Sequence, residues 1–143
     1  MGPKVSTAAA RAGVAAAALL TLLAMAGCGD VSFRSGAHTT AAAIAPDVAK
    51  RLLESDTTVL VVDVRNQDEW NDRYGHLPRA RQIPLPDLER RLGELAPWKD
   101  KTIILVCTVG QRSHRAAEIL EAHGFKDARN LSGGLQAWRD AGY

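Results

Sequence analysis

The sequence has little cysteine, few aromatic residues and no excess charge in its main part, and these shortages exclude several classes of protein. Two cysteines, Cys28 and Cys107, are too few for a disulfide framework. Four scattered histidines lack the spacing of zinc ligands, so we expect no metal site. The net charge of +2 comes from Lys4 and Arg11, because residues 28–143 hold basic and acidic side chains in equal number. We therefore expect no nucleic-acid partner.

No apolar run is long enough to cross a membrane and stay there. Val14–Ala26 spans 13 residues with one polar member, Thr21, whereas a spanning helix needs about 20. A short basic region precedes this run, as in a secretory signal. The run ends in Met25-Ala26-Gly27-Cys28, which resembles a bacterial lipobox except at Met25, where Leu, Val or Ile is usual.

We therefore expect residues 1–27 to be a cleaved signal peptide of the lipoprotein type and Cys28 to be lipidated. The protein would then be anchored to a membrane of the bacterial cell envelope, on its periplasmic or extracellular face, through lipid alone. An ordinary signal peptide with a chance cysteine is the alternative. Residues 28–45 are rich in small side chains and resemble a flexible tether, which leaves residues 46–143 as one folded domain.

The rest of the sequence alternates between helical and strand patterns. Thr58–Val64 is a continuous β-branched run and Thr102–Val106 is a second strong run, and both are typical of strands buried on both faces. This alternation predicts an α/β domain with a mainly parallel sheet, whose ligands lie beyond the carboxyl ends of the strands. The other expected helices are 46–54 (with Val48, Leu52 and Leu53 inward), 68–73, 88–95, 113–123 and 134–139, and the other expected strands are 82–85 and 128–131.

The segment after the second buried strand carries the chemistry. Cys107 leads through a glycine-containing loop directly into a helix, whose first N–H groups and partial positive charge favour an anion. Gly110 allows the loop to curl, and Arg112 adds a full positive charge. These features favour the thiolate of Cys107 and lower its pKa. The alternative is that Cys107 is a small buried apolar residue.

Four motifs in order resemble the rhodanese-like sulfurtransferases, over nearly all of residues 46–143. They are Asp63-Val64-Arg65 with Glu69-Trp70, Gly75-His76-Leu77-Pro78, Cys107 to Ser113, and Leu131-Ser132-Gly133-Gly134-Leu135-Gln136-Ala137-Trp138. The resemblance implies a three-layer fold, with a mainly parallel central sheet flanked by helices.

The resemblance also implies a mechanism in which Cys107 is the nucleophile and carries sulfur as a persulfide. The donor would be thiosulfate or a persulfide, the acceptor would be cyanide, a thiol or a protein cysteine, and no cofactor would be needed. The implied binding loop comprises Thr108, Val109, Gly110, Gln111, Arg112 and Ser113. We expect Asp63, Arg65 and His76 to support this loop structurally, with Arg65 paired to Glu69.

The loop itself bears on the substrate. By resemblance, the six residues from Cys107 to Arg112 fit a sulfur atom, while phosphatases and arsenate reductases of this fold have one residue more. Thr108 and Val109 stand where many active relatives carry a cation or polar group, which disfavours the thiosulfate dianion. Arg79 replaces a glycine that is usual in the second motif.

Two other functions remain open. One is a non-catalytic rhodanese-like module that binds a partner or senses oxidants through Cys107. The other is a dithiol oxidoreductase, which is disfavoured because there is no Cys-X-X-Cys and a lipid would block Cys28.

Overall fold

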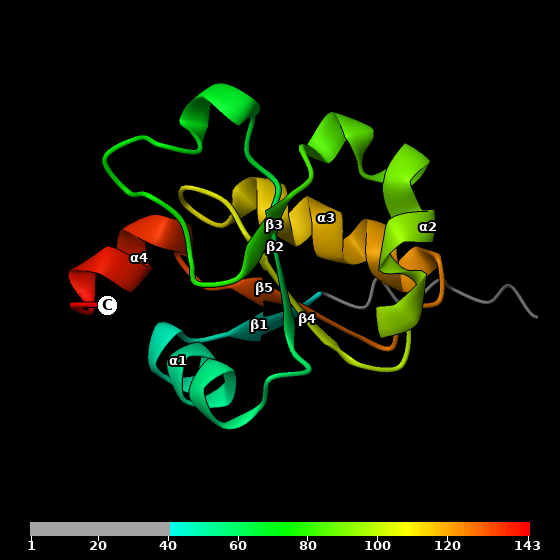
Figure 1. Cartoon of the computed structure of the whole chain (residues 1–143), viewed down its shortest axis with the longest axis horizontal. Coiled ribbons are helices and arrows are strands. Elements are labelled where there is room, and N and C mark those ends of the chain that lie inside the picture. Colours follow the sequence, from blue (N-terminus) through cyan, green and yellow to red (C-terminus); the bar gives the residue numbers. More distant parts are fainter. Residues whose placement is uncertain (1–40) are drawn as a thin grey trace, which may run out of the picture. The chain divides into compact units, whose positions relative to one another are not determined.

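The computed structural model describes residues 41–143, so the expected signal peptide, the expected lipidation of Cys28 and most of the expected tether lie outside the described residues. These residues form a parallel sheet covered by helices on both faces (Figure 1). The strands are β1 (Ala42–Ile44), β2 (Leu60–Asp63), β3 (Ala80–Gln82), β4 (Thr102–Val106) and β5 (Asp127–Leu131). Their order is β1-β5-β4-β2-β3, and every neighbouring pair is parallel. The predicted α/β class and parallel sheet are confirmed.

Two helical layers enclose the sheet. The α-helices are α1 (Pro46–Ser55), α2 (Leu92–Leu95), α3 (Gln111–Ala122) and α4 (Gly134–Asp140). The 3-10 turns are η1 (Gln67–Glu69), η2 (Leu85–Asp87), η3 (Glu89–Arg91) and η4 (Ala96–Trp98). Side chains of α2 and α3 pack on one face of the sheet, and those of α1 and α4 pack on the other. Within residues 41–143, no helix has the length and apolar character that crossing a membrane requires.

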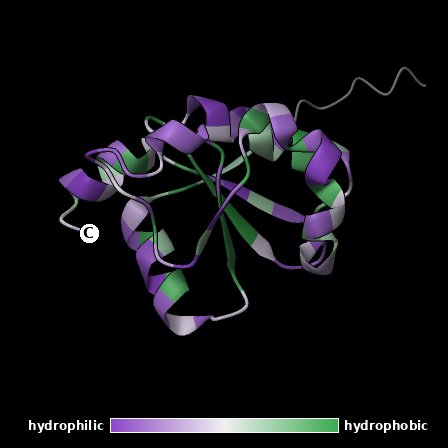
Figure 2. Cartoon of the chain, turned by 45° about the horizontal axis from the view of Figure 1, so that its top comes forward, coloured by the Kyte–Doolittle hydropathy of each residue, from purple (hydrophilic) through white to green (hydrophobic). Residues whose placement is uncertain are grey.

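The buried strands follow from the two apolar runs of the sequence. All four residues of β2 and the last four of β4 are buried, and side chains alternate between the two core clusters. Figure 2 shows these central strands as hydrophobic and the outer surfaces of the helices as largely hydrophilic. Such strands need cover on both faces, which the two helical layers provide.

Several element boundaries differ from the sequence predictions. Residues 42–44, which we assigned to the tether, form β1 and pair with β5. Val48 was expected inward but is 40% exposed, and Ala49 is buried in its place. The third strand lies at Ala80–Gln82 rather than 82–85, because its pairing partner is β2 from Val61 to Asp63. The leucine-rich helix expected over 88–95 is divided into short turns, although Leu88 and Leu95 are buried as expected.

Candidate active site

Cys107 lies where the parallel sheet predicts a ligand site, directly after β4 and before α3. The chain turns sharply between them, and Gly110 adopts a left-handed conformation with φ of 96° at the start of α3. A side chain at this position would strain the backbone. Cys107 is 1% exposed, whereas Val109 is 51% exposed and Gln111 is also exposed. The sulfur therefore lies beneath a loop whose outer surface is partly apolar.

Hydrogen bonds from the loop converge on the Cys107 sulfur. The backbone N–H of Gly110 lies 3.1 Å from Sγ, and the hydroxyl of the fully buried Ser113 lies 3.3 Å from it. Burial raises the pKa of the Cys107 thiol, but hydrogen bonds from Ser113, Gly110 and Val109 outweigh it and lower the pKa from its ordinary value. The expected stabilisation of the thiolate has this physical source.

Ser113 has a second partner that the sequence analysis missed. Its hydroxyl donates to Oδ1 of Asn130, on β5, at 2.7 Å. Asn130 comes three residues before the glycine pair of the fourth motif, and it showed no periodic or charge signal of its own. The parallel pairing of β4 with β5 brings it to this site.

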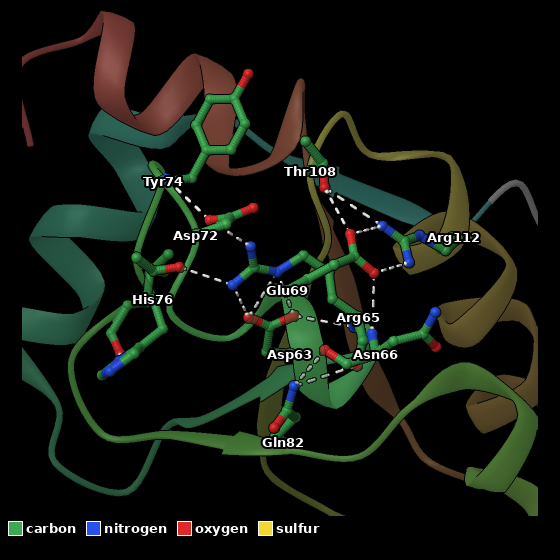
Figure 3. Close-up of polar contacts among 12 residues, drawn as sticks. Asp63, Arg65, Asn66, Glu69, Asp72, Tyr74, His76, Gln82, Thr108 and Arg112 are labelled. Atoms are coloured by element: carbon green, nitrogen blue, oxygen red, sulfur yellow. Dashed lines mark hydrogen bonds and ion pairs between the residues drawn. The ribbon is translucent and has the colours of Figure 1, made fainter.

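Arg112 is held by Glu69, a residue of η1, and not left free in the loop. Two guanidinium nitrogens each lie 2.6 Å from a carboxylate oxygen of Glu69 (Figure 3). Hydrogen bonds from Arg112 are the main reason that the pKa of Glu69 is lowered to about 2. Thr108 joins the same cluster, with its hydroxyl 3.3 Å from Arg112 and 3.4 Å from Glu69. The carboxylate of Glu69 therefore neutralises the positive charge that Arg112 brings to the loop.

The expected pair of Arg65 with Glu69 is wrong. Arg65 is fully buried and donates to Asp63, which is also fully buried, with Nη2 2.7 Å from Oδ2. A second carboxylate, that of Asp72, lies 3.1 Å from Nη1. Burial lowers the pKa of Arg65, but its bonds to Asp63 and Asp72 raise it by more, so the guanidinium stays charged.

This buried pair supports the chain after β2 and through it the active-site loop. Arg65 Nη2 also donates to the carbonyl of Gly75 at 2.7 Å, which ties both ends of a ten-residue excursion together (Figure 3). Glu69 lies within that excursion, so Asp63 and Arg65 fix the segment that presents Glu69 to Arg112. His76 is exposed and stacks on Trp70, with ring centroids 4.1 Å apart. It lies on the far side of this network from Thr108 and Arg112 (Figure 3).

The glycine pair at the start of α4, Gly133 and Gly134, completes the site from the other side. Leu135 N–H donates to the carbonyl of Cys107 at 2.8 Å, and Gln136 N–H donates to that of Thr108 at 3.0 Å. A Cβ atom on Gly134 would lie 2.3 Å from the Cys107 oxygen, so only glycine allows this approach. The start of α4 thus fixes the backbone of the active-site loop.

A cavity of about 580 Å³ lies elsewhere, between α1 and α4, and includes Leu53, His76, Trp138 and Tyr143 in its lining. None of residues 107–113 lines this cavity. We take the Cys107 loop, and not the cavity, as the candidate active site, because the loop holds the sulfur together with its hydrogen-bond donors. Among residues 41–143, no three side chains of the metal-ligating types come together.

Comparison with known proteins decides the family. The family model described as Rhodanese-like domain matches residues 45–141, more than half of the chain. The chain belongs to the rhodanese-like family. A sulfurtransferase of Allochromatium vinosum is 33% identical to this rhodanese-like protein over 91 residues, covering 64% of this chain and 80% of the relative. The putative sulfur carrier protein YrkF of Bacillus subtilis is 32% identical over 95 residues, covering 66% of this chain and 49% of the relative.

Solved structures agree with the family assignment. The rhodanese-like domain protein of Staphylococcus aureus has 35% sequence identity and a TM-score of 0.60, with 68% of this chain and 90% of that one covered. The chain described here spans about half the length of YrkF and 28% of the probable adenylyltransferase/sulfurtransferase MoeZ of Mycobacterium tuberculosis. The likeness therefore concerns the rhodanese-like domain that these proteins share.

Proposed function

We propose that this protein is a sulfurtransferase that carries sulfane sulfur as a persulfide on Cys107. The observation that supports this most is the convergence of the Gly110 N–H, at 3.1 Å, and the Ser113 hydroxyl, at 3.3 Å, on a buried sulfur at the start of α3. Donors placed in this way stabilise negative charge on sulfur, which each step of the transfer requires.

The transfer consists of two displacements at sulfur. The Cys107 thiolate attacks the outer sulfur of the donor, a new S–S bond forms, and the donor's S–S bond breaks with its electron pair leaving on the departing group. An acceptor thiolate or cyanide then attacks the outer sulfur of the Cys107 persulfide, and the bond to Cys107 Sγ breaks to regenerate the thiolate. No net oxidation occurs, and no cofactor takes part.

The charges around the loop favour a donor with little negative charge. Glu69 neutralises Arg112, and Val109 adds an exposed apolar surface at the entrance. A low-molecular-weight or protein persulfide needs less positive charge at the site than the thiosulfate dianion does. Within residues 107–113 the one cation, Arg112, is paired with Glu69, so the loop offers thiosulfate no free positive charge. Phosphate and arsenate esters are refused, since oxyanion oxygens without hydrogen-bond donors cost about 1–3 kcal/mol each.

Intact-mass spectrometry after incubation with a low-molecular-weight persulfide tests this function. We expect one added sulfur atom, removable by cyanide or a thiol, and no addition to the Cys107→Ser variant. If the folded protein gains no sulfur from a persulfide or from thiosulfate, the transferase proposal is wrong, and a binding or thiol-sensing module takes its place.

We further propose that the protein is anchored in the bacterial cell envelope by lipid on Cys28. This proposal is supported by the sequence of residues 4–28 alone. Two or more acyl chains are needed for stable anchoring, so the mature form should partition into detergent. The Cys28→Ala variant should lose that partitioning. A mature wild-type protein that begins at another residue and is free in solution would contradict the anchor.

A further inference from the structure

The hydroxyl of Ser113 has three possible acceptors but only one hydrogen. Asn130 Oδ1 lies 2.7 Å from Ser113 Oγ, while Cys107 Sγ and the carbonyl oxygen of Gly110 each lie 3.3 Å from it. A serine hydroxyl donates one hydrogen bond at a time. Asn130 and the Cys107 sulfur therefore compete for the same donor.

The position of Asn130 in the sheet brings its side chain to Ser113, and the competition therefore follows from the fold. Side chains alternate along β5, so Asn130 faces the same side as Ala128, which packs in the cluster beneath α3. Ser113 is fully buried on α3, whereas Asn130 is half-buried. Ser113 is the hydrogen-bond partner that the structure gives to Oδ1 of Asn130.

We propose that Asn130 is a positioning residue that restrains the Ser113 hydroxyl and so limits its hydrogen bond to the Cys107 sulfur. When the hydroxyl points to Asn130, Ser113 Oγ presents a lone pair to sulfur, an arrangement that suits the neutral S–H group. When the thiolate forms, the hydroxyl turns to Sγ and gives up the bond to Asn130. No covalent bond changes in this rotation.

The other groups that act on the thiol lie on other elements than β5, which carries Asn130. Arg112 and its partner Glu69 form the ion pair that faces the loop from α3 and η1. The backbone donors of Val109, Gly110 and Ser113 belong to the loop and the start of α3. If substitution of Asn130 changes the acidity of the thiol only when Ser113 is present, the effect is transmitted by the Ser113 hydroxyl.

The test is a double-mutant cycle on the rate of Cys107 alkylation by iodoacetamide as a function of pH. It uses the full chain, with modification of Cys107 followed by peptide mass spectrometry. In Asn130→Ala the hydroxyl is free for sulfur, so the midpoint should fall by about half to one pH unit, or about threefold to tenfold in the thiolate equilibrium. In Asn130→Asp, a stronger and negatively charged acceptor should raise the midpoint.

The Ser113→Ala background decides between positioning and a general structural effect. There, Asn130→Ala should leave the midpoint unchanged, because the hydroxyl that couples the two residues is gone. Asn130→Val, which suits a strand, repeats the measurement if the alanine variant does not fold. An unchanged or raised midpoint in Asn130→Ala and Asn130→Val, or the same shift without Ser113, would overturn the proposal. The readout needs no sulfur donor, so it stands apart from the proposed transferase activity.

Discussion

The chain segments that follow β2 and β4 start side by side at the carboxyl end of the sheet, yet they accommodate charge in different ways. At the end of β2 and just after it, two charged side chains are fully buried, and the carboxylate of Asp63 balances the guanidinium of Arg65. After β4, Cys107 is approached by a backbone N–H and a hydroxyl. A fixed buried charge needs a full counter-charge. A charge that forms only during part of a reaction is better stabilised by neutral hydrogen-bond donors, because these do not become unpaired buried charges when the sulfur is uncharged.

The two segments meet at the ion pair of Glu69 with Arg112. Glu69 belongs to the segment after β2, whose ends Arg65 joins through its bond to the carbonyl of Gly75, and Arg112 belongs to the helix that follows the Cys107 loop. The buried pair of Asp63 and Arg65 therefore has a second consequence, because it positions the carboxylate that neutralises the entrance to the thiol. The contrast between fixed and transient charge can be tested at the buried pair, at the Cys107 loop and at the ion pair that joins the two segments.

The largest expected effect is on the buried pair. Asp63→Ala leaves Arg65 buried with only the half-exposed Asp72 as a carboxylate partner, so the free energy of unfolding should fall by about 3–5 kcal/mol. Urea unfolding measures this loss. Glu94→Ala breaks the exposed pair with Arg91 and serves as the matched control, with a far smaller loss expected. Equal losses in the two variants would mean that Asp63 and Arg65 are not an essential pair.

A second effect is expected where α4 contacts the Cys107 loop. In Gly134→Ala the new Cβ would lie 2.3 Å from the Cys107 oxygen and 2.6 Å from that of Thr108, at a φ of +63°. The loop must move, at a cost of about 1–3 kcal/mol, and the Cys107 midpoint should rise toward the free value of about 8.5. Gly93→Ala is the control, since its Cβ would meet nothing within 4 Å. A folded Gly134→Ala protein with the wild-type midpoint would contradict the role of this contact.

Patterns within short stretches of sequence predicted most of the fold. The run Thr102–Val106 became β4 with the same bounds, and the helix after the Cys107 loop formed as expected. Strand β1 was missed because three residues rich in alanine carry little strand signal and are fixed by pairing with β5. The position of Cys107 was predictable, since a parallel sheet presents its carboxyl ends to ligands.

Partners distant in sequence were not predictable in the same way. Glu69 and Arg112 are separated by 43 positions, and the geometry that joins them is set by neighbouring strands. The local spacing of Arg65 and Glu69 suggested a pair instead, but burial of Arg65 directs it to the buried Asp63. Asn130 was missed for the same reason, because only the pairing of β5 with β4 brings it to Ser113.

A third prediction concerns the neutralised cation at the entrance. Glu69→Gln removes the carboxylate but keeps an acceptor for the N–H of Asn66, which Glu69 now binds at 3.0 Å. Arg112 then becomes available to a dianion, and kcat/KM for thiosulfate should rise about tenfold relative to a persulfide donor, equivalent to about 1.4 kcal/mol. Val109→Lys should act in the same direction by adding a cation. An unchanged ratio of the two donors in both variants would remove charge as the basis of donor preference.

The smallest effect tests whether the segment after β2 also stores backbone strain. Arg79 has a φ of 60° and is the one non-glycine residue with positive φ among residues 41–143. Its Nη2 donates to the carbonyl of Leu53, near the end of α1, at 2.8 Å, and this hydrogen bond offsets part of the strain. Arg79→Ala keeps the strain and loses the hydrogen bond, so unfolding should cost about 0.5–1.5 kcal/mol less than in the wild type.

Arg79→Gly separates the strain from the hydrogen bond. It loses the same bond but relieves a Cβ contact worth about 1–2 kcal/mol. The greater freedom of glycine in the unfolded chain offsets about 0.4–1 kcal/mol of that relief. Arg79→Gly should therefore be more stable than Arg79→Ala by about 0.5–1 kcal/mol and lie close to the wild type in urea unfolding. If alanine and glycine at position 79 give the same stability, the strain relieved is no larger than the cost of about 0.4–1 kcal/mol for glycine in the unfolded chain, and the expected strain of about 1–2 kcal/mol is absent.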